Sequence, residues 1–249
     1  MTRSTDRHCR RGLRLLALLA ALAALAGGPA AAEDLSSTVR AVYGGSSRPA
    51  TIAVLEAALA AITREAGLQY SMTIEPPERA VQSFRAGLYA VEVGRFENFG
   101  ELVPGAHRID SPVMTLRYVT LGRNPAIRPK SWQELAPLSV VYVRGFKRVE
   151  QQLSLVPSVR REVAKSPDAC VAMAALDRVD VCVLPVLLVA PPPEPPAGVT
   201  LYESLLDRAH LYLWTSPEHG LLAKRLNQAA AALERRGELD RLLGPNRER

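Results

Sequence analysis

The sequence predicts an α/β protein built from mixed, mostly parallel sheets flanked by helices. Short strand-like segments alternate with amphipathic helical segments along the chain, as in strand–helix–strand units. Two of these strands, at residues 139–143 and 180–184, are almost entirely apolar, which is typical of strands buried on both faces. A chain of 249 residues is long enough to bury a sizeable core.

In the first half of the chain we expect three short strands, two helices and one longer extended segment. The strands are predicted at residues 38–43, 70–74 and 90–93, and the extended segment at residues 112–121. An apolar stripe with helical spacing predicts a helix over residues 51–66, with Gly67 as its C-terminal cap. A second helix, over residues 76–86, begins at a proline and is closed by Gly87.

In the second half we expect the same alternation. Ser131-Trp132-Gln133-Glu134 matches a capping box, which predicts a helix start. Further helices are predicted at residues 145–155, 168–176 and from about 216 to 236, and further strands at 139–143, 180–184 and 210–214. The run P-P-P-E-P-P at residues 191–196 excludes a helix and an inner strand, so it predicts a surface loop or stiff linker.

The first 32 residues are predicted to be a cleavable secretory signal peptide. Five arginines precede an unbroken Leu/Ala run at residues 15–26, and small residues at positions 30–32 provide the cleavage pattern. The run is shorter than a membrane span of about 20 residues, although an N-terminal anchor helix remains an alternative. We therefore expect a periplasmic protein. Arg10-Arg11 is compatible with twin-arginine export as well as with general secretion.

The positive charge of the chain belongs largely to this signal. Residues 1–32 contain five arginines and one aspartate, and removing them from a formal net charge of +6 leaves +2. So small an excess does not indicate nucleic acid as a partner.

Two cysteines, Cys170 and Cys182, remain after the predicted cleavage. They lie on a predicted helix and on the strand that follows it, at positions where the two sulfurs could be level with each other. In an exported protein such a pair is either a disulfide or two small buried hydrophobic side chains, and both alternatives stay open.

Three predicted strands end in glycine-containing joints, at residues 44–47, 94–95 and 144–147. In parallel sheets, ligands bind beyond such strand ends, where helix N-termini offer free N–H groups. Arg144 and Lys147 flank Gly145 in the third joint, which suits an anion such as a carboxylate. The alternative is a pair of solvated cations on a surface turn.

The order of four segments resembles the type II periplasmic solute-binding proteins, in the amino-acid-receptor branch (family 3) associated with ABC transporters. These segments are residues 78–95, residues 131–145, residues 172–180 and residues 222–243. Each motif is weak alone, and their order carries the resemblance. The run R-G-F-K-R-V-E at residues 144–150 is closest to a less characterised group of such proteins.

The resemblance implies a two-lobed fold with a ligand cleft that closes by a hinge motion. Lobe 1 would comprise residues 33–113 and 191–249, and lobe 2 residues 114–190. In the amino-acid receptors, an acidic residue of lobe 2 holds the ligand's amino group. Here Pro185 lies near the expected place of that residue, which argues against an ordinary α-amino acid as the ligand.

The predicted ligand-binding residues are mostly cations and aromatic residues. Arg95 follows a strand and a glycine, and an arginine there can grip a carboxylate with two hydrogen bonds. Arg144, Gly145 and Lys147 are expected to hold the ligand from lobe 2. The remaining candidates are Tyr43, Arg79, Tyr89, Glu92 and Arg117.

The sequence favours a binding protein over an enzyme. It contains no H-E-x-x-H, G-x-S-x-G or P-loop motif, and we expect no cofactor and no metal site. Three interpretations stand: a monomeric receptor serving a membrane permease, a sensor or partner-binding module of a signalling system, and a periplasmic dehydratase-like enzyme on the same fold.

Overall fold

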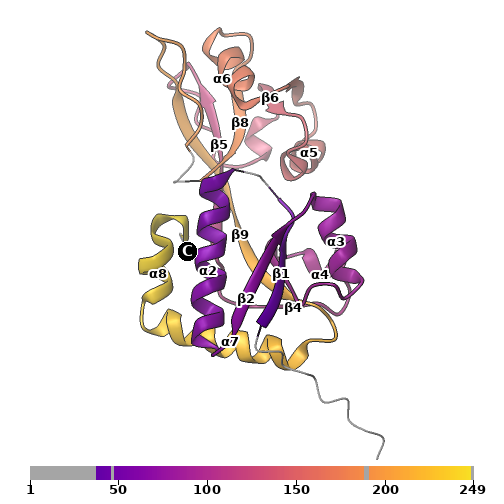
Figure 1. Cartoon of the computed structure of the whole chain (residues 1–249). Helices are drawn as coiled ribbons and strands as arrows, with labels where there is room; N and C mark the ends of the chain where they lie inside the picture. The colour runs from indigo at the N-terminus through magenta and orange to yellow at the C-terminus, as the bar shows by residue number, and fades with distance from the viewer. Residues whose placement is uncertain (1–37, 46–47, 188–190, 248–249) are drawn as a thin grey trace, which may run out of the picture. The chain divides into compact units, whose positions relative to one another are not determined.

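The computed structural model describes residues 38–45, 48–187 and 191–247 of the chain (Figure 1). The predicted signal peptide lies outside these residues. By their contacts, the described residues form one compact unit.

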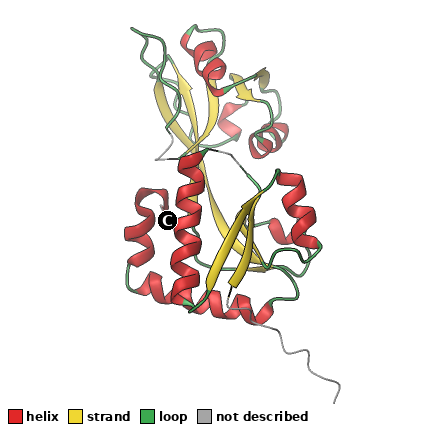
Figure 2. Cartoon of the chain, viewed as in Figure 1, coloured by secondary structure: helices red, strands yellow, loops and turns green. Residues whose placement is uncertain are grey.

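The described residues contain nine strands, seven α-helices and two 3₁₀ turns (Figure 2). The strands are β1 (Thr38–Tyr43), β2 (Gln69–Ile74), β3 (Val91–Phe96), β4 (His107–Arg108), β5 (Met114–Gly122), β6 (Ser139–Val143), β7 (Arg160–Ala164), β8 (Val181–Val186) and β9 (Tyr202–Thr215). The helices are α2 (Pro49–Glu65), α3 (Pro77–Arg85), α4 (Phe99–Leu102), α5 (Lys147–Ser154), α6 (Pro167–Ala175), α7 (Gly220–Arg235) and α8 (Glu238–Leu243). The 3₁₀ turns are η1 (Gln133–Leu135) and η2 (Gly244–Arg247).

The strands form one mixed sheet in the order β2-β1-β3-β9-β5-β8-β6-β7, with β4 added to β9. β1 is parallel to β2 and β3, and β6 is parallel to β7 and β8. Antiparallel pairing occurs where β5 and β9 join the sheet. The predicted α/β class with mixed sheets is therefore confirmed.

The long strand β9 connects the two parts of the sheet. Its residues 202–211 pair with β5, and its residues 211–215 pair with β3. The sequence predicted only residues 210–214 as a strand, because the preceding residues are more polar. The lobe boundary at residue 191 remains a prediction, but residues 202–210 of β9 pair with a strand of the predicted second lobe.

Helices cover both faces of each part of the sheet. Successive strand residues point to opposite faces, so neighbouring residues of one strand pack against different helices. In β1, Ala41 and Tyr43 pack in a core with α2 and α7, whereas Val42 packs in another with α3. In β8, Val183 packs with residues of α5 and Cys182 with residues of α6. Strands buried on both faces consist almost entirely of apolar residues, which is why β6 and most of β8 could be predicted from the sequence.

Several local predictions were wrong. The capping box at residues 131–134 begins only the short turn η1, because the Ser131 hydroxyl donates to the Glu134 carboxylate instead of capping a helix. Helix α5 begins at Lys147, and Gly145 lies in the turn before it with φ of +90°. Strand β7, short helix α4 and strand β4 were not predicted. Helix α4 and strand β4 are short, strand β7 lies at the edge of the sheet, and none of the three carries much periodic signal.

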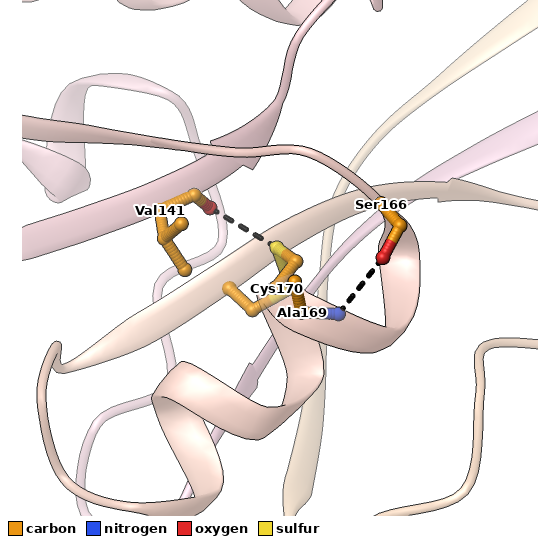
Figure 3. Close-up of a disulfide and its surroundings, with 5 residues drawn as sticks. Val141, Ser166, Ala169 and Cys170 are labelled. Carbon is orange, nitrogen blue, oxygen red and sulfur yellow. Dashed lines mark hydrogen bonds between the residues drawn. A yellow bond between two sulfur atoms is a disulfide. The ribbon is translucent and has the colours of Figure 1, made fainter.

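Cys170 and Cys182 form a disulfide between α6 and β8, so the disulfide alternative is the one present. Their Cα atoms are 5.5 Å apart, within the usual range. The helix start is fixed by Ser166, whose hydroxyl accepts a hydrogen bond from the Ala169 N–H at 3.2 Å (Figure 3). Sγ of Cys170 also lies 3.5 Å from the carbonyl oxygen of Val141 on β6, so the disulfide packs against the centre of this part of the sheet.

Candidate functional site

A cavity of about 290 Å³ lies where several strands end, which places it at the lower end of the size of small-molecule sites. Strands β1 and β3, the start of α2, the crossing strands β5 and β9, the end of β8 and the turn before α5 all contribute to its lining. Its polar and glycine positions are Gly44, Gly45, Arg48, Thr51, Gly94 and Arg95. Its apolar body comes mainly from Phe96, Met114, Leu116, Phe146, Pro185 and Leu211.

Two glycines shape the backbone around Arg95, and one of them, Gly44, lies against its side chain. A Cβ atom at Gly44 would collide with Nη2 of Arg95 and would lie 2.5 Å from Cβ of Ala80. Gly94 has φ of +74°, a left-handed conformation that side chains of other residues rarely adopt. The joints that the sequence singled out after β1 and in β3 therefore do lie at the cavity.

Gly94 is the extra residue of a β-bulge. The register between β3 and β9 shifts between Val93 and Arg95, so Gly94 is left without a directly paired residue. Arg95 was expected to follow the strand, but β3 continues through Phe96. The bulge turns Arg95 to the same side of the sheet as Glu92, and Nε of Arg95 donates to Oε1 of Glu92 at 2.6 Å.

The guanidinium of Arg95 is held on three sides. Besides Glu92, its Nη2 donates to the carbonyl oxygen of Pro77 at 3.3 Å. Its carbon Cζ lies 5.3 Å from the centre of the Phe99 ring, a cation–π distance. Two of its five N–H groups are engaged in these hydrogen bonds, which leaves donors for a ligand in the cavity.

Glu92 is fully buried, and its second carboxylate oxygen has no hydrogen-bond partner in the described structure. Burial raises the pKa of Glu92 to about 7, and the nearby Arg95 opposes this rise. Glu92 therefore titrates near neutral pH beneath the Arg95 guanidinium. Its carboxylate does not itself line the cavity.

Pro185 lines the cavity from within strand β8, although the strand was predicted to end at residue 184. It pairs with Tyr118 of β5. On the other side of β8, β6 pairs only as far as Val183. A proline is tolerated there because β8 is paired on one side only beyond Val183, as at a sheet edge.

Of the predicted ligand-binding residues, Tyr43 and Arg95 line the cavity. Tyr89 instead donates its hydroxyl to Glu75 at 3.0 Å, and Arg117 pairs with Glu203 at 2.7 Å. Arg79 is exposed on α3 and is not part of the lining.

The turn before α5 already binds a carboxylate from within the chain, that of Glu150. The Gly145 N–H donates to Oε1 of Glu150 at 2.9 Å, and Nζ of Lys147 lies 3.3 Å from Oε2 of the same carboxylate. The Gly145 hydrogen bond and then the Lys147 hydrogen bond lower the pKa of Glu150. Arg144 is exposed, and of this turn Phe146 is the residue that lines the cavity.

Sequence reasoning missed several lining residues. Arg48 and Thr51 were overlooked because helix α2 was expected to begin at Thr51, whereas it begins at Pro49. The dipeptide Arg48-Pro49, with proline at the first helical position, was the available signal. Phe146 lies in the third glycine-containing joint, at residues 144–147, but the binding role was assigned to the cations Arg144 and Lys147 in that joint.

Phe96 connects the cavity to helix α5. Cζ of Arg148, on α5, lies 5.7 Å from the Phe96 ring centre and 5.5 Å from that of Tyr118. Arg148 also pairs with Asp207 of β9 at 3.1 Å, and Asp207 accepts a hydrogen bond from the Trp132 indole at 3.0 Å. Phe96 therefore both lines the cavity and contacts Arg148 of α5, which is in turn paired with Asp207 of β9.

The part of the chain that the structure describes holds no group of three or more His, Cys, Asp or Glu side chains placed to bind a metal ion. Within the same residues, no helix has both the length and the apolar character needed to span a membrane.

No protein-family model matches the chain. An uncharacterized protein from Shewanella oneidensis is 30% identical over 118 residues, which cover 46% of this chain and 45% of that protein. The match therefore spans less than half of that relative's length.

Solved structures with the same fold are numerous. An ancestral cationic amino acid solute-binding protein superposes with a TM-score of 0.59 at 13% identity, covering 85% of this chain and 96% of that one. A structure described as an ancestral amino-acid-binding protein and precursor of cyclohexadienyl dehydratase gives 0.56 at 14%, covering 85% and 96%. The periplasmic VFT2 domain of BvgS from Bordetella pertussis gives 0.57 at 18%, covering 85% and 94%. The chain thus has the two-lobed fold of type II periplasmic binding proteins.

Proposed function

We propose that this protein is a periplasmic receptor that captures a small organic ligand in the cavity and closes its two lobes around it. The observation that carries the proposal is the cavity itself. It lies at strand ends of a type II periplasmic-binding fold, is lined by residues from β1, β3 and β8, and contains a guanidinium held in place by Glu92 and Pro77.

Closure is proposed to bend the two strands that connect the lobes. Met114, at the start of β5, pairs with Leu211, where β9 passes from pairing with β5 to pairing with β3. Both residues line the cavity, so a ligand would touch the place where the chain crosses between the lobes. The contact of Phe96 with Arg148 would transmit the presence of the ligand to α5.

The proposed location is the periplasm, reached through the signal peptide at residues 1–32. The disulfide between Cys170 and Cys182 supports an oxidising compartment. Solved structures with this fold include a solute-binding protein and a histidine kinase sensor domain with similarity to periplasmic binding proteins. We propose a membrane permease as the partner, with a membrane sensor protein as the alternative.

The test is thermal unfolding of the purified protein against amino acids, mono-, di- and tricarboxylates, aromatic acids and polyamines. A ligand at one hundred times its dissociation constant stabilises by about 2.7 kcal/mol, which raises Tm by roughly 5–10 °C for a chain of this size. A Leu116→Trp variant, which fills the cavity, should lose the shift. A panel without any shift for protein free of co-purified ligand would overturn the receptor function.

A dehydratase-like activity is the second candidate, because Glu92, whose pKa burial raises to about 7, is hydrogen-bonded to the cavity arginine and could act as an acid or base only through it. Turnover of any bound acid, followed by mass spectrometry and abolished by Glu92→Gln, would replace the receptor function with an enzymatic one. Binding without turnover supports the receptor.

A further inference from the structure

The charges around the cavity are one-sided. Among the described residues that line it, Arg48 and Arg95 are the only charged side chains, and both are cations. Glu92, the nearest acidic side chain to Arg95, is already engaged by it at 2.6 Å.

A ligand ammonium group would therefore lack an anionic partner. Moving an ammonium out of water costs far more than moving a neutral polar group unless it is paired and hydrogen-bonded. Hydroxyl and backbone oxygens of Tyr43, Thr51 and the glycines are the polar acceptors in the lining. Neutral acceptors of this kind do not offset the repulsion between a ligand ammonium group and the two guanidinium groups.

A ligand anion, in contrast, meets three favourable features. Arg95 is immobilised by Glu92 and Pro77, so little side-chain entropy is lost when it binds. Arg48 is the N-terminal cap of α2, a helix of 17 residues whose N-terminus carries a partial positive charge. Thr51, in the first turn of that helix, is buried and lines the cavity.

The rest of the lining suits an apolar body. Phe96 and Phe146 offer aromatic surface, and Met114, Leu116 and Leu211 offer aliphatic surface. A ligand with many hydroxyl or amide groups would leave them without partners against these side chains.

We propose that the cavity selects small organic acids with an apolar branched or aromatic body and without an ammonium group. This inference rests on the proposed receptor function and adds the class of ligand. Arg95 holds the carboxylate, Arg48 and the start of α2 contribute positive potential, and the Phe96 and Phe146 walls enclose the apolar body.

The test compares matched compounds by calorimetry at neutral pH. The aromatic series is 3-phenylpropanoate, phenylalanine and 2-phenylethylamine, and the aliphatic series is 4-methylpentanoate, leucine and 3-methylbutylamine. Within each series the body is kept while the charged groups change. We expect at least one acid to bind at least tenfold more tightly than its amino acid, and the amines not to bind.

Variants then locate the binding. Arg95→Met should weaken acid binding at least tenfold, and Arg48→Met should weaken it less. The double variant Glu92→Gln/Arg95→Met removes both members of the buried pair and should show the same loss if the single variant folds poorly. Arg178→Met, an exposed arginine outside the cavity lining, should bind as the unaltered protein does.

Two outcomes would overturn the inference. One is an amino acid or amine that binds as tightly as the matched acid. The other is no binding of any of the six compounds. If a broader panel still yields a ligand that Leu116→Trp excludes, the receptor function stands and only the ligand class is wrong. If that panel is also empty, both proposals fail.

Discussion

Nε of Arg95 lies 2.6 Å from Oε1 of Glu92, although the two residues are three apart in one strand. In a regular strand an odd separation places side chains on opposite faces. The bulge at Gly94 adds one residue to β3 and returns Arg95 to the face of Glu92. One glycine in a left-handed conformation therefore creates the ion pair that positions the cavity arginine.

Gly94→Ala should disturb this arrangement. A side chain at φ of +74° costs about 1–2 kcal/mol, and the added Cβ would lie 2.9 Å from Cδ1 of Leu55. We expect lower stability in urea unfolding together with weaker ligand binding. Gly198→Ala is the matched control, because Gly198 has φ of +80° and no atom within 4 Å of an added Cβ. It should lose comparable stability and keep its binding, and equal binding by the two variants would contradict the role of the bulge.

Glu92 should make stability depend on pH between about 4.5 and 7. Burial raises the pKa of Glu92 in the folded protein to about 7 from an ordinary value of 4.5. Its contribution is therefore fully present below pH 4.5 and is lost as the pH rises through 7. We expect Glu92→Gln to reduce the fall in the free energy of unfolding over this range.

The measurement is urea unfolding at several pH values for the unaltered protein and for Glu92→Gln. Every other titrating group is common to both proteins, so the difference between the two curves isolates Glu92. A difference that is constant from pH 5 to pH 8 would show that Glu92 does not titrate there.

Breaking the disulfide should lower stability by up to about 3 kcal/mol, because the bridged cysteines are 12 residues apart and the closed loop is short. A reductant should lower Tm of the unaltered protein and leave Tm of the double variant Cys170→Ala/Cys182→Ala unchanged. Equal effects of the reductant on both proteins would show that the bond is not what it acts on.

Arg247, near the C-terminus, should contribute strongly to the free energy of unfolding. Its side chain is fully buried and donates to the carbonyl oxygen of Pro112 at 2.7 Å and to Glu234 at 2.8 Å. We expect Arg247→Met to cost about 1–3 kcal/mol, less than a fully buried pair because Glu234 stays partly in water. Arg236→Met, which removes an exposed arginine paired with Glu65, should cost clearly less, because solvent screens an exposed pair. Similar losses in urea unfolding would contradict this ranking.

Arg144→Met tests the predicted anchor in the turn before α5. Because Glu150 already accepts the Gly145 N–H and pairs with Lys147, we expect this variant to change ligand affinity less than twofold. A tenfold loss would mean that the ligand displaces Glu150 when the lobes close. Calorimetry with the best ligand of the panel decides between the two outcomes.

The sequence by itself determined the elements whose signal is local. The apolar runs of β6 and β8 report burial on both faces, the stripe in α2 has helical spacing, and glycines mark the turns after β1 and within β3. From these features the α/β class could be predicted, together with Tyr43 and Arg95 as lining residues. The cysteine pair could be placed on adjacent elements, but bonded and free states remained equally open.

The tertiary structure alone decided what depends on partners distant in sequence. Strand β9 is held by pairing with β3 and β5, so its polar first half carries no strand signal of its own. The cations at Arg144 and Lys147 looked like a ligand site, but whether an anion within the chain reaches them depends on how α5 begins. Likewise Phe146 and Pro185 become cavity walls only when strands far apart in sequence end side by side. Local pattern reports which side chains are buried, whereas a binding site is defined by which of them meet.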